Sequence, residues 1–488
     1  MKLLKDILYK VRLEEIAGPT DILVGHLTFD SRQVKKGSVF VAVKGTQADG
    51  HHFIEQAVQK GAIAIIVEQM PSLLADKVTY VKVKNSGEAL GIMSSNFYDN
   101  PSSRLKLIAV TGTNGKTTTV TLLYHLFRQL GHKTGMLSTV QNEINGKVIP
   151  ATHTTPDAVQ INELLAKMVR AKCTHCFMEA SSIAIDQHRV SGLHFTGAVF
   201  TNISHDHLDY HKTFKNYILA KKKLFDNLPS SAFALINADD RNARVMVQNT
   251  RAKVYTYSLK RPADFRLKIL ENTLSGLVLK VDDHEVYTRL VGEFNAYNLL
   301  AVYATAMLLG AERMQILKIM SQLQAADGRF QYFISPKRKV VGIVDYAHTP
   351  DALKNVLSTI NSIRSGNEQL ITVVGCGGNR DKDKRPVMAN IASQLSNRVV
   401  LTSDNPRDED PESIISQMLK GVDAGSRRKV ITIVDRKEAI RAACAMAQAG
   451  DIILLAGKGH EKYQEIKGKK FPFDDKEILQ TTLQALDE

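Results

Sequence analysis

Short apolar runs alternate with amphipathic segments along most of this chain. Runs with the length and continuity of buried strands occur at 105–110, 176–180, 197–203 and 233–237, and again at 340–344, 370–374, 399–402, 430–434 and 452–456. The residues between them repeat their apolar positions with helical spacing. Strands that alternate with helices in this way predict two open, mainly parallel α/β sheets covered by helices.

Three interruptions divide this pattern. Residues 99–103 are rich in turn formers, 265–291 alternate like an antiparallel patch, and 327–329 are typical of a hinge. We therefore predict an α/β fold of three domains. They are a small N-terminal α/β domain over 1–102, a central parallel sheet with an antiparallel patch over 103–328, and a Rossmann-like α/β domain over 329–488.

Composition narrows the class of protein. A chain of 488 residues is too long for one hydrophobic core, and its 44% hydrophobic and 23% charged residues are ordinary for a globular protein. It has no apolar run of about 18 residues, and charge follows Met1 directly, so we expect neither a membrane span nor a signal peptide. The few cysteines suit reduced thiols in a cytoplasmic protein.

Two features of the composition allow more than one interpretation. Cys173 and Cys176 form a C-x-x-C pair that could be redox-active or half a zinc site, but Cys176 lies in an apolar run, which favours core packing. The net charge of +14 could indicate nucleic-acid binding, yet no basic run or RNA-binding signature accompanies it. A polyanionic small substrate together with ATP explains the charge equally well.

The stretch 110–118 predicts a phosphate-binding loop. It follows a predicted strand, contains two glycines, and ends in Lys116-Thr117-Thr118 at the start of a predicted helix. Backbone N–H groups of such a turn surround phosphates, the lysine reaches the β and γ phosphates, and the next hydroxyl can hold Mg²⁺. Val110 stands where the usual motif has its first glycine. The central domain is therefore predicted to be P-loop ATPase-like.

Polar residues gather after six predicted strands, at the carboxyl ends where open α/β sheets place their sites. The clusters begin at Glu179, Thr201, Asp345, Gly375, Asp404 and Gly457. Beside a phosphate loop, six such clusters predict one large site shared by two domains.

Taken together, these segments resemble the Mur ligase family over almost the whole chain. The matching motifs are the loop 111–118, the segments 201–202 and 206–211, the G-x-F-N-x-x-N start of a helix at 292–298, and the D-Y-A-H of 345–348. Asp30-Ser31-Arg32, Lys44-Gly45 and Asp49-Gly50-His51 resemble the uridine-nucleotide domain of the member that adds the third residue of the peptidoglycan stem peptide.

The resemblance implies an ATP-dependent amide ligase of peptidoglycan precursor synthesis. Such an enzyme joins meso-2,6-diaminopimelate to the D-glutamate γ-carboxylate of UDP-N-acetylmuramoyl-L-alanyl-D-glutamate through an acyl phosphate. An amine cannot displace oxide from a carboxylate, so activation is required, and positioning and charge neutralisation supply most of the catalysis. The implied cofactors are ATP, Mg²⁺ and a lysine carbamate formed with CO₂. We expect a monomer without a nucleic-acid partner.

The resemblance also assigns catalytic, ATP-binding and metal-binding residues. Lys116, Lys221 and His207 are the expected catalytic residues. The expected ATP-binding residues are Gly112, Thr113, Asn114, Gly115, Lys116, Thr117, Thr118, Asn295, Arg329 and Asp345, and the expected Mg²⁺ ligands are Thr117, Glu179, His207 and carbamylated Lys221. Spacing from Tyr217 in Y-x-x-A-K selects Lys221 over Lys222 and Lys223; the alternative is a solvated basic helix face.

The resemblance also implies which residues bind the UDP-muramoyl dipeptide. The residues expected to bind the UDP-muramoyl dipeptide are Ser31, Thr154, Thr155, Ser181, Gln187 and Arg189, with Ser31 at the uridine diphosphate end. Thr154-Thr155 could instead cap a helix, whereas the guanidinium of Arg189 suits a carboxylate or phosphate. Ile183 replaces a histidine common at that position, so we expect that histidine to be dispensable.

The incoming amino acid is predicted from the D-N-P-R at 404–407, the form found in ligases that add diaminopimelate. The residues expected to bind it are Arg380, Asp404, Asn405, Pro406, Arg407, Gly457 and Glu461. Arg407 can pair bidentately with the carboxylate that lysine lacks, and Glu461 would face an ammonium. The alternative is an Asn-Pro turn with a surface arginine.

Three other functions remain open at this point. They are a lysine-adding ligase of the same family, a folylpolyglutamate synthetase-like ligase, and an ATP-dependent nucleic-acid-binding protein. Arg407 argues against the first and Asp30-Ser31-Arg32 against the second. Dispersed basic charge without aromatic residues among it argues against the third.

Overall fold

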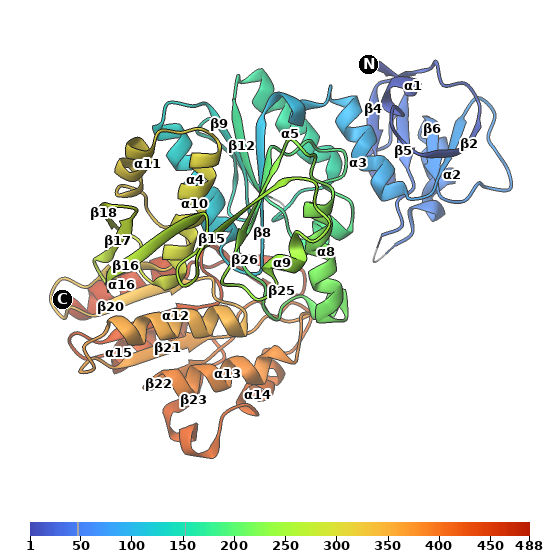
Figure 1. Cartoon of the computed structure of the whole chain (residues 1–488). Helices are drawn as coiled ribbons and strands as arrows, with labels where there is room; N and C mark the ends of the chain where they lie inside the picture. Colours follow the sequence, from blue (N-terminus) through green and yellow to red (C-terminus); the bar gives the residue numbers. More distant parts are fainter. Residues whose placement is uncertain (46–47, 152) are drawn as a thin grey trace.

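The computed structural model describes residues 1–45, 48–151 and 153–488, which form three main sheets (Figure 1). The N-terminal sheet has the order β2 (Leu13–Ala17), β7 (Thr79–Val83), β6 (Ala62–Val67), β5 (Ser38–Val41) and β4 (His26–Thr28). All neighbours are parallel except β2 and β7. In Figure 1 this lobe lies to one side, joined through α3 (Ser86–Phe97).

The middle sheet has eleven strands, because the predicted antiparallel patch extends the parallel sheet. Its order is β11 (Lys147–Ile149), β10 (Asn142–Ile144), β9 (Thr134–Leu137), β12 (His175–Glu179), β8 (Lys106–Thr111), β13 (Gly197–Phe200), β14 (Phe233–Asn237), β15 (Lys253–Ser258), β16 (Phe265–Thr273), β17 (Gly276–Val281) and β18 (His284–Thr288). The strands from β9 to β16 along this order are parallel, and the two ends are antiparallel.

Strand β8 shows why helices cover both faces of the middle sheet. Ile108 and Val110 point into a core with α4 (Lys116–Gln129) and α10 (Glu293–Leu308), whereas Leu107 and Ala109 point into the core with α5 (Ala158–Arg170) and α8 (Phe214–Asp226). Successive side chains of a strand point to opposite faces of the sheet, and here the four named are all apolar, so neither face of the sheet is exposed to solvent at these positions of β8. Cys173 and Cys176 are buried in the second core as free thiols, which confirms the packing interpretation.

The C-terminal sheet has the order β19 (Gln331–Ile334), β20 (Val341–Asp345), β24 (Ile452–Ala456), β21 (Leu370–Val374), β22 (Arg398–Leu401) and β23 (Val430–Thr432). Only the edge strand β19 is antiparallel within this sheet. Helices α12 (Pro350–Ile363), α13 (Lys384–Leu395) and α14 (Pro411–Leu419) cover one face, and α15 (Arg436–Met446) and α16 (Asp475–Asp487) the other. The predicted three-domain α/β fold is confirmed.

Several elements were not predicted. They are the β9–β11 strands, β15, the edge strand β19, and a hairpin of β25 (Tyr463–Ile466) and β26 (Lys469–Pro472) that follows β24. Among the residues described, no helix is long and apolar enough to cross a membrane.

Candidate active site

The predicted phosphate loop connects β8 to α4 and depends on its two glycines. Gly112 and Gly115 have φ of +153° and +87°, a region that favours glycine. A Cβ on Gly112 would collide with the hydroxyl of Thr201, and one on Gly115 with the side chain of Asn298. Thr201 also donates from Oγ1 to the carbonyl of Asn114 at 2.6 Å. Close packing against the end of β13 therefore fixes the shape of the loop.

Two lysines from different helices converge on this loop. Lys116 donates from Nζ to the carbonyl oxygens of Gly112 and Thr113, both at 2.8 Å, and Lys221 donates to the Gly112 carbonyl at 2.9 Å. Burial lowers the pKa of Lys116. Burial, and then the charge of Lys116, lowers the pKa of Lys221 far below its usual value. Tyr217 supports the pair, since its hydroxyl bonds Thr113 Oγ1 at 3.0 Å.

The three consecutive lysines of α8 have different surroundings. Lys221 and Lys222 are 1% and 5% exposed, so the interpretation of this helix face as solvated is wrong for both. Lys222 pairs with Asp226 at 2.6 Å and Lys223 with Asp186 at 2.7 Å. Of the three, Lys221 is the one directed at the loop.

A buried carboxylate beside the loop has an oxygen without a partner. Glu179, at the end of β12, accepts through Oε1 from the N–H of Thr139 at 2.7 Å, whereas its Oε2 is buried and forms no hydrogen bond. A buried carboxyl oxygen without a hydrogen-bond partner in that position can accept a cation. Within the described ranges no group of three or more His, Cys, Asp or Glu side chains is arranged so that it could hold a metal ion, so the carboxylate alone does not define a metal centre.

The other expected metal ligands approach from two sides. Thr117 is buried at the start of α4, and its Oγ1 accepts from the guanidinium of Arg329 at 3.1 Å. His207 has φ of +53°, and its Nε2 lies 3.4 Å from Oδ2 of Asp206. Burial lowers the pKa of His207, which favours the neutral imidazole that binds metals.

A cleft of about 1010 Å³ lies next to the loop, between the middle and C-terminal sheets. Of the residues expected to bind ATP, those that line it are Asn114, Gly115, Thr118, Arg329 and Asp345. Asn295 does not line it but accepts through Oδ1 from Asn298, which does. Lining residues missed from the sequence are Asn237, Asp239, Lys260, Tyr297, Asn298 and Asp351. Asn237 ends β14, so the strand-end rule could have identified it.

Side chains from the C-terminal sheet close one wall of this cleft. Asp351, in the first turn of α12, accepts through Oδ2 from Nδ2 of Asn114 at 2.9 Å and from Ser204 Oγ at 3.1 Å. Asp345 is buried and accepts from the N–H of Phe330 at 2.7 Å. Burial raises the pKa of Asp345 to about 6.

Four of the residues expected to bind the muramoyl dipeptide form one hydrogen-bonded cluster beside Glu179. Thr155 Oγ1 donates to the Glu179 carbonyl at 2.8 Å and accepts from the N–H of Ser181 at 3.1 Å. Arg189 donates to Gln187 Oε1 at 2.6 and 3.0 Å and to the Thr155 carbonyl at 2.9 Å. The cluster therefore holds one guanidinium in place between Gln187 and Thr155.

Of the two remaining dipeptide residues, Thr154 lies next to the cluster and Ser31 lies in the N-terminal domain. Thr154 accepts through Oγ1 from Thr139 Oγ1 at 3.2 Å, and the cap of α5 is Asp157, so the N-cap interpretation of Thr154-Thr155 is wrong. Ser31 lies in the N-terminal domain, in a short helix capped by Asp30. Its carbonyl accepts from Lys60 Nζ at 2.9 Å.

The residues expected to bind diaminopimelate follow β21, β22 and β24. Asp404, Asn405 and Pro406 are buried, and Arg380 is exposed. Arg407 is 22% exposed, donates to the Gly378 carbonyl at 2.8 Å and lies 3.3 Å from Glu465 Oε2. Its φ of +52° is rare for a residue other than glycine, so the surrounding contacts hold it in place. The interpretation as a free surface arginine is therefore wrong.

A buried lysine lies among these residues and was missed from the sequence. Lys458 is 0% exposed, and its Nζ lies 3.0 Å from Asn405 Oδ1 and 3.5 Å from Glu461 Oε2. Gly457, next to it, has φ of +113°, and its N–H donates to the Asp345 carbonyl at 3.0 Å. That bond links the amino-acid side of the site to the nucleotide side.

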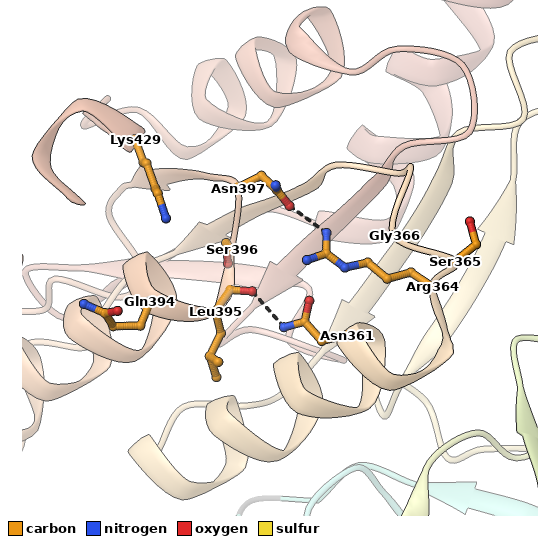
Figure 2. Close-up of a pocket in the computed structure, with 9 residues that line it drawn as sticks. All are labelled: Asn361, Arg364, Ser365, Gly366, Gln394, Leu395, Ser396, Asn397 and Lys429. Carbon is orange, nitrogen blue, oxygen red and sulfur yellow. Dashed lines mark hydrogen bonds between the residues drawn. The ribbon is translucent and has the colours of Figure 1, made fainter. Parts of the chain in front are cut away.

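A second hollow, of about 510 Å³, lies at the amino ends of β21 and β22 (Figure 2). Its polar groups bond one another: Arg364 donates to Asn397 Oδ1 at 2.6 Å, and Asn361 to the Leu395 carbonyl at 2.8 Å. It contains none of the predicted site residues and lies at the opposite end of the sheet. The carboxyl ends therefore hold the candidate active site.

Comparison with known proteins agrees with this geometry. Three family models match: "Mur ligase family, catalytic domain" over 24–98, "Mur ligase middle domain" over 110–306, and "Mur ligase, glutamate ligase domain" over 328–459. The UDP-N-acetylmuramoyl-L-alanyl-D-glutamate–2,6-diaminopimelate ligase of Cytophaga hutchinsonii is 60% identical over 485 residues, which cover 99% of each chain. The protein of that name from Bacteroides fragilis is 52% identical over 476 residues, 98% of each chain.

A solved structure agrees as well. A structure described as UDP-N-acetylmuramoyl-L-alanyl-D-glutamate–2,6-diaminopimelate ligase has a TM-score of 0.71 and 34% identity, covering 100% of this chain and 99% of its own. Sequence and fold thus match over their full lengths, and the chain belongs to the Mur ligase family.

Proposed function

We propose that this protein is the ATP-dependent ligase that adds meso-2,6-diaminopimelate to UDP-N-acetylmuramoyl-L-alanyl-D-glutamate in peptidoglycan precursor synthesis. The observation that carries this proposal is the buried D-N-P-R turn, where Arg407 is held by Glu465 and the Gly378 carbonyl. Two full-length relatives bear the name of that ligase. A fixed guanidinium suits the carboxylate that distinguishes diaminopimelate from lysine.

The reaction requires that ATP phosphorylate the γ-carboxylate of the D-glutamate, after which the amine attacks the acyl phosphate and phosphate leaves. Lys116 would hold the transferring phosphoryl group, and the loop N–H groups would surround the other phosphates. Asn114, Arg329 and Asp345 line the adjoining cleft, which suits the nucleoside. Arg189 would hold an anionic group of the dipeptide beside Glu179.

Magnesium fits the residues near the loop. Bound Mg²⁺ neutralises phosphate charge as it develops. The unpartnered Oε2 of Glu179, the Thr117 hydroxyl and the neutral His207 imidazole provide oxygen and nitrogen donors for it. Lys221 would add a further anion as its carbamate, which forms when the neutral amine attacks CO₂ and releases a proton. The depressed pKa of Lys221 supplies that neutral amine.

The remaining assignments complete the proposal. We assign the uridine diphosphate end to Ser31, the peptide to Thr154, Thr155, Ser181 and Gln187, and the amino acid to Arg380, Asp404, Asn405, Pro406, Gly457 and Glu461. Asn295 would act on ATP through Asn298. We place the domain boundaries at 1–102, 103–328 and 329–488, and propose a monomer in the bacterial cytoplasm.

One assay tests the function. ADP release is measured with the UDP-muramoyl dipeptide and either meso-diaminopimelate or lysine. Release that depends on diaminopimelate supports the proposal, and release with lysine alone favours the lysine-adding alternative. Nucleic-acid binding would show a steep salt dependence of affinity, and its absence excludes that class.

A further inference from the structure

Lys458 is a wholly buried cation among the residues assigned to the incoming amino acid. It follows β24, and its ammonium contacts three oxygen atoms from two strand ends: Asn405 Oδ1 at 3.0 Å, Glu461 Oε2 at 3.5 Å and Asp404 Oδ1 at 3.8 Å. The rings of Tyr463 and Phe473 have their centroids 5.7 and 5.9 Å away. A lysine without water around it needs such partners.

The charges of this group leave room for one more cation. Two carboxyl groups, those of Asp404 and Glu461, are 8% and 16% exposed and face the single side-chain amine of Lys458. Arg436, a buried guanidinium that also senses the charges of Asp404 and Glu461, is paired with Asp475 at 2.7 Å. Two carboxyl groups around one lysine leave a carboxyl group for the ammonium of an incoming diamino acid.

Hydrogen bonds also decide which oxygen of Glu461 is available. Asn405 Oδ1 accepts from Lys458 and from the N–H of Glu465, so its Nδ2 is turned to Glu461 Oε2, at 2.7 Å. Lys458 approaches the same Oε2. The other oxygen, Oε1, accepts only a long 3.5 Å bond from Tyr346 among the described residues.

We propose that Lys458 is a positioning residue for the incoming diamino acid, holding the Asn405 amide and Glu461 Oε2 so that Oε1 receives the substrate ammonium. This inference rests on the proposed function. It assigns Lys458 no contact with ATP or the muramoyl dipeptide.

The groups around Glu461 predict how the loss of Lys458 would change the pKa of Glu461. Burial and the charge of Asp404 raise the pKa of Glu461, whereas Lys458 and the Asn405 amide lower it. Tyr346 and Arg436 are the other titratable groups facing it. Removing the Lys458 charge raises that pKa further, so the carboxylate that binds the ammonium forms only at higher pH.

The test compares Lys458→Met with wild type across pH, using KM for diaminopimelate, ATP and the muramoyl dipeptide. KM for diaminopimelate should rise about tenfold or more, as for loss of a charge-assisted hydrogen bond, with the other two KM values within about threefold. The acid limb of kcat/KM for diaminopimelate should move to higher pH. In a Glu461→Gln background, Lys458→Met should add little.

Distinct results overturn the inference and the function. A wild type inactive with diaminopimelate would refute the proposed function. An active wild type with Lys458→Met unchanged, or with all three KM values raised equally, would refute the role of Lys458. If Lys458→Met does not fold, Lys458→Arg retains the charge and should keep the wild-type acid limb; a shifted limb in that variant would refute the role.

Discussion

Lys116 and Lys221 donate to one acceptor, the carbonyl oxygen of Gly112, at 2.8 and 2.9 Å. Two ammonium groups that close in a buried site repel each other, and the charge of Lys116 is accordingly a cause of the low pKa of Lys221. Conversion of Lys221 to a carbamate would replace this repulsion with attraction. The same geometry therefore favours an ammonium on Lys116, which can bind phosphate, and a carbamate anion on Lys221.

Lys116→Ala should abolish amide formation and leave the fold intact, because Lys116 is half-buried in an anion-binding loop rather than in a core. Steady-state ADP release and the thermal transition would be measured together. The exposed Lys318 on α11 (Arg313–Met320) provides a matched control, and Lys318→Ala should keep both the wild-type ADP release and the wild-type thermal transition. Near wild-type turnover in Lys116→Ala would show that ATP is not bound as assigned.

Lys221→Ala should be nearly inactive, and short carboxylic acids should restore part of its activity by supplying the missing anion. Lys223→Ala, which removes a half-exposed pair with Asp186, should stay close to wild type. Lys222→Ala leaves the partly buried Asp226 unpaired, so it should lower Tm more than kcat. A fully active Lys221→Ala would refute the carbamate.

Arg407→Ala should lower kcat/KM for diaminopimelate far more than for lysine. Leaving one desolvated charge unpaired costs on the order of 2–5 kcal/mol, which is roughly 30- to several-thousand-fold. Lysine lacks the carboxylate and should not lose a comparable factor. Both amino acids would be measured with both proteins. An equal loss for the two amino acids would contradict a discriminating role for Arg407.

Asp345→Asn should stabilise the protein at alkaline pH more than at acid pH. The pKa of Asp345 rises from 3.8 to about 6 on folding. Below pH 4 the group is protonated in both states. Between about pH 4 and 6 the aspartate at this position is ionised in the unfolded chain but not in the folded one, so the free energy of unfolding falls as pH rises. Above pH 6 the wild type has lost up to about 3 kcal/mol of that free energy.

The measurement for Asp345 is Tm at pH 4.5 and pH 8. Asparagine keeps a carbonyl oxygen for the N–H of Phe330, so the native bond can persist. The gain in Tm over wild type should be larger at pH 8. The exposed Asp283 offers a control, Asp283→Asn, in which both gains should be close to zero. Equal gains for Asp345→Asn at both pH values would contradict the raised pKa.

The fold was largely predictable because its strands are buried on both faces and therefore appear as continuous apolar runs. Ile108 and Leu107, for example, are buried in the cores on opposite faces of the middle sheet, and both are apolar. The β9–β11 strands and β15 were missed because they are short or partly exposed, as Lys253 and Val254 of β15 are. The edge strand β19 likewise alternates half-buried and exposed positions, so its pattern is weak.

The site was predictable where its residues are adjacent in sequence, as in the loop and the D-N-P-R turn. Asp351 and Lys260 come from distant segments and join the cleft only through the packing of two domains. The burial of Lys222 depends on Asp226 one helical turn away, and that of Lys458 on Asp404, which follows another strand. From sequence spacing alone, such lysines are predicted to be exposed to solvent, because isolated buried charges are rare.

Asp351 gives the nucleotide loop a direct connection to the sheet that carries Arg407. Its carboxylate binds Asn114 of the loop and Ser204 after β13, while its own helix packs on the C-terminal sheet. If nucleotide binding acts through this contact to change the affinity for the amino acid by some factor, amino-acid binding changes the affinity for the nucleotide by the same factor. One carboxylate at the junction of two domains can thus couple the affinities of the nucleotide and the amino acid.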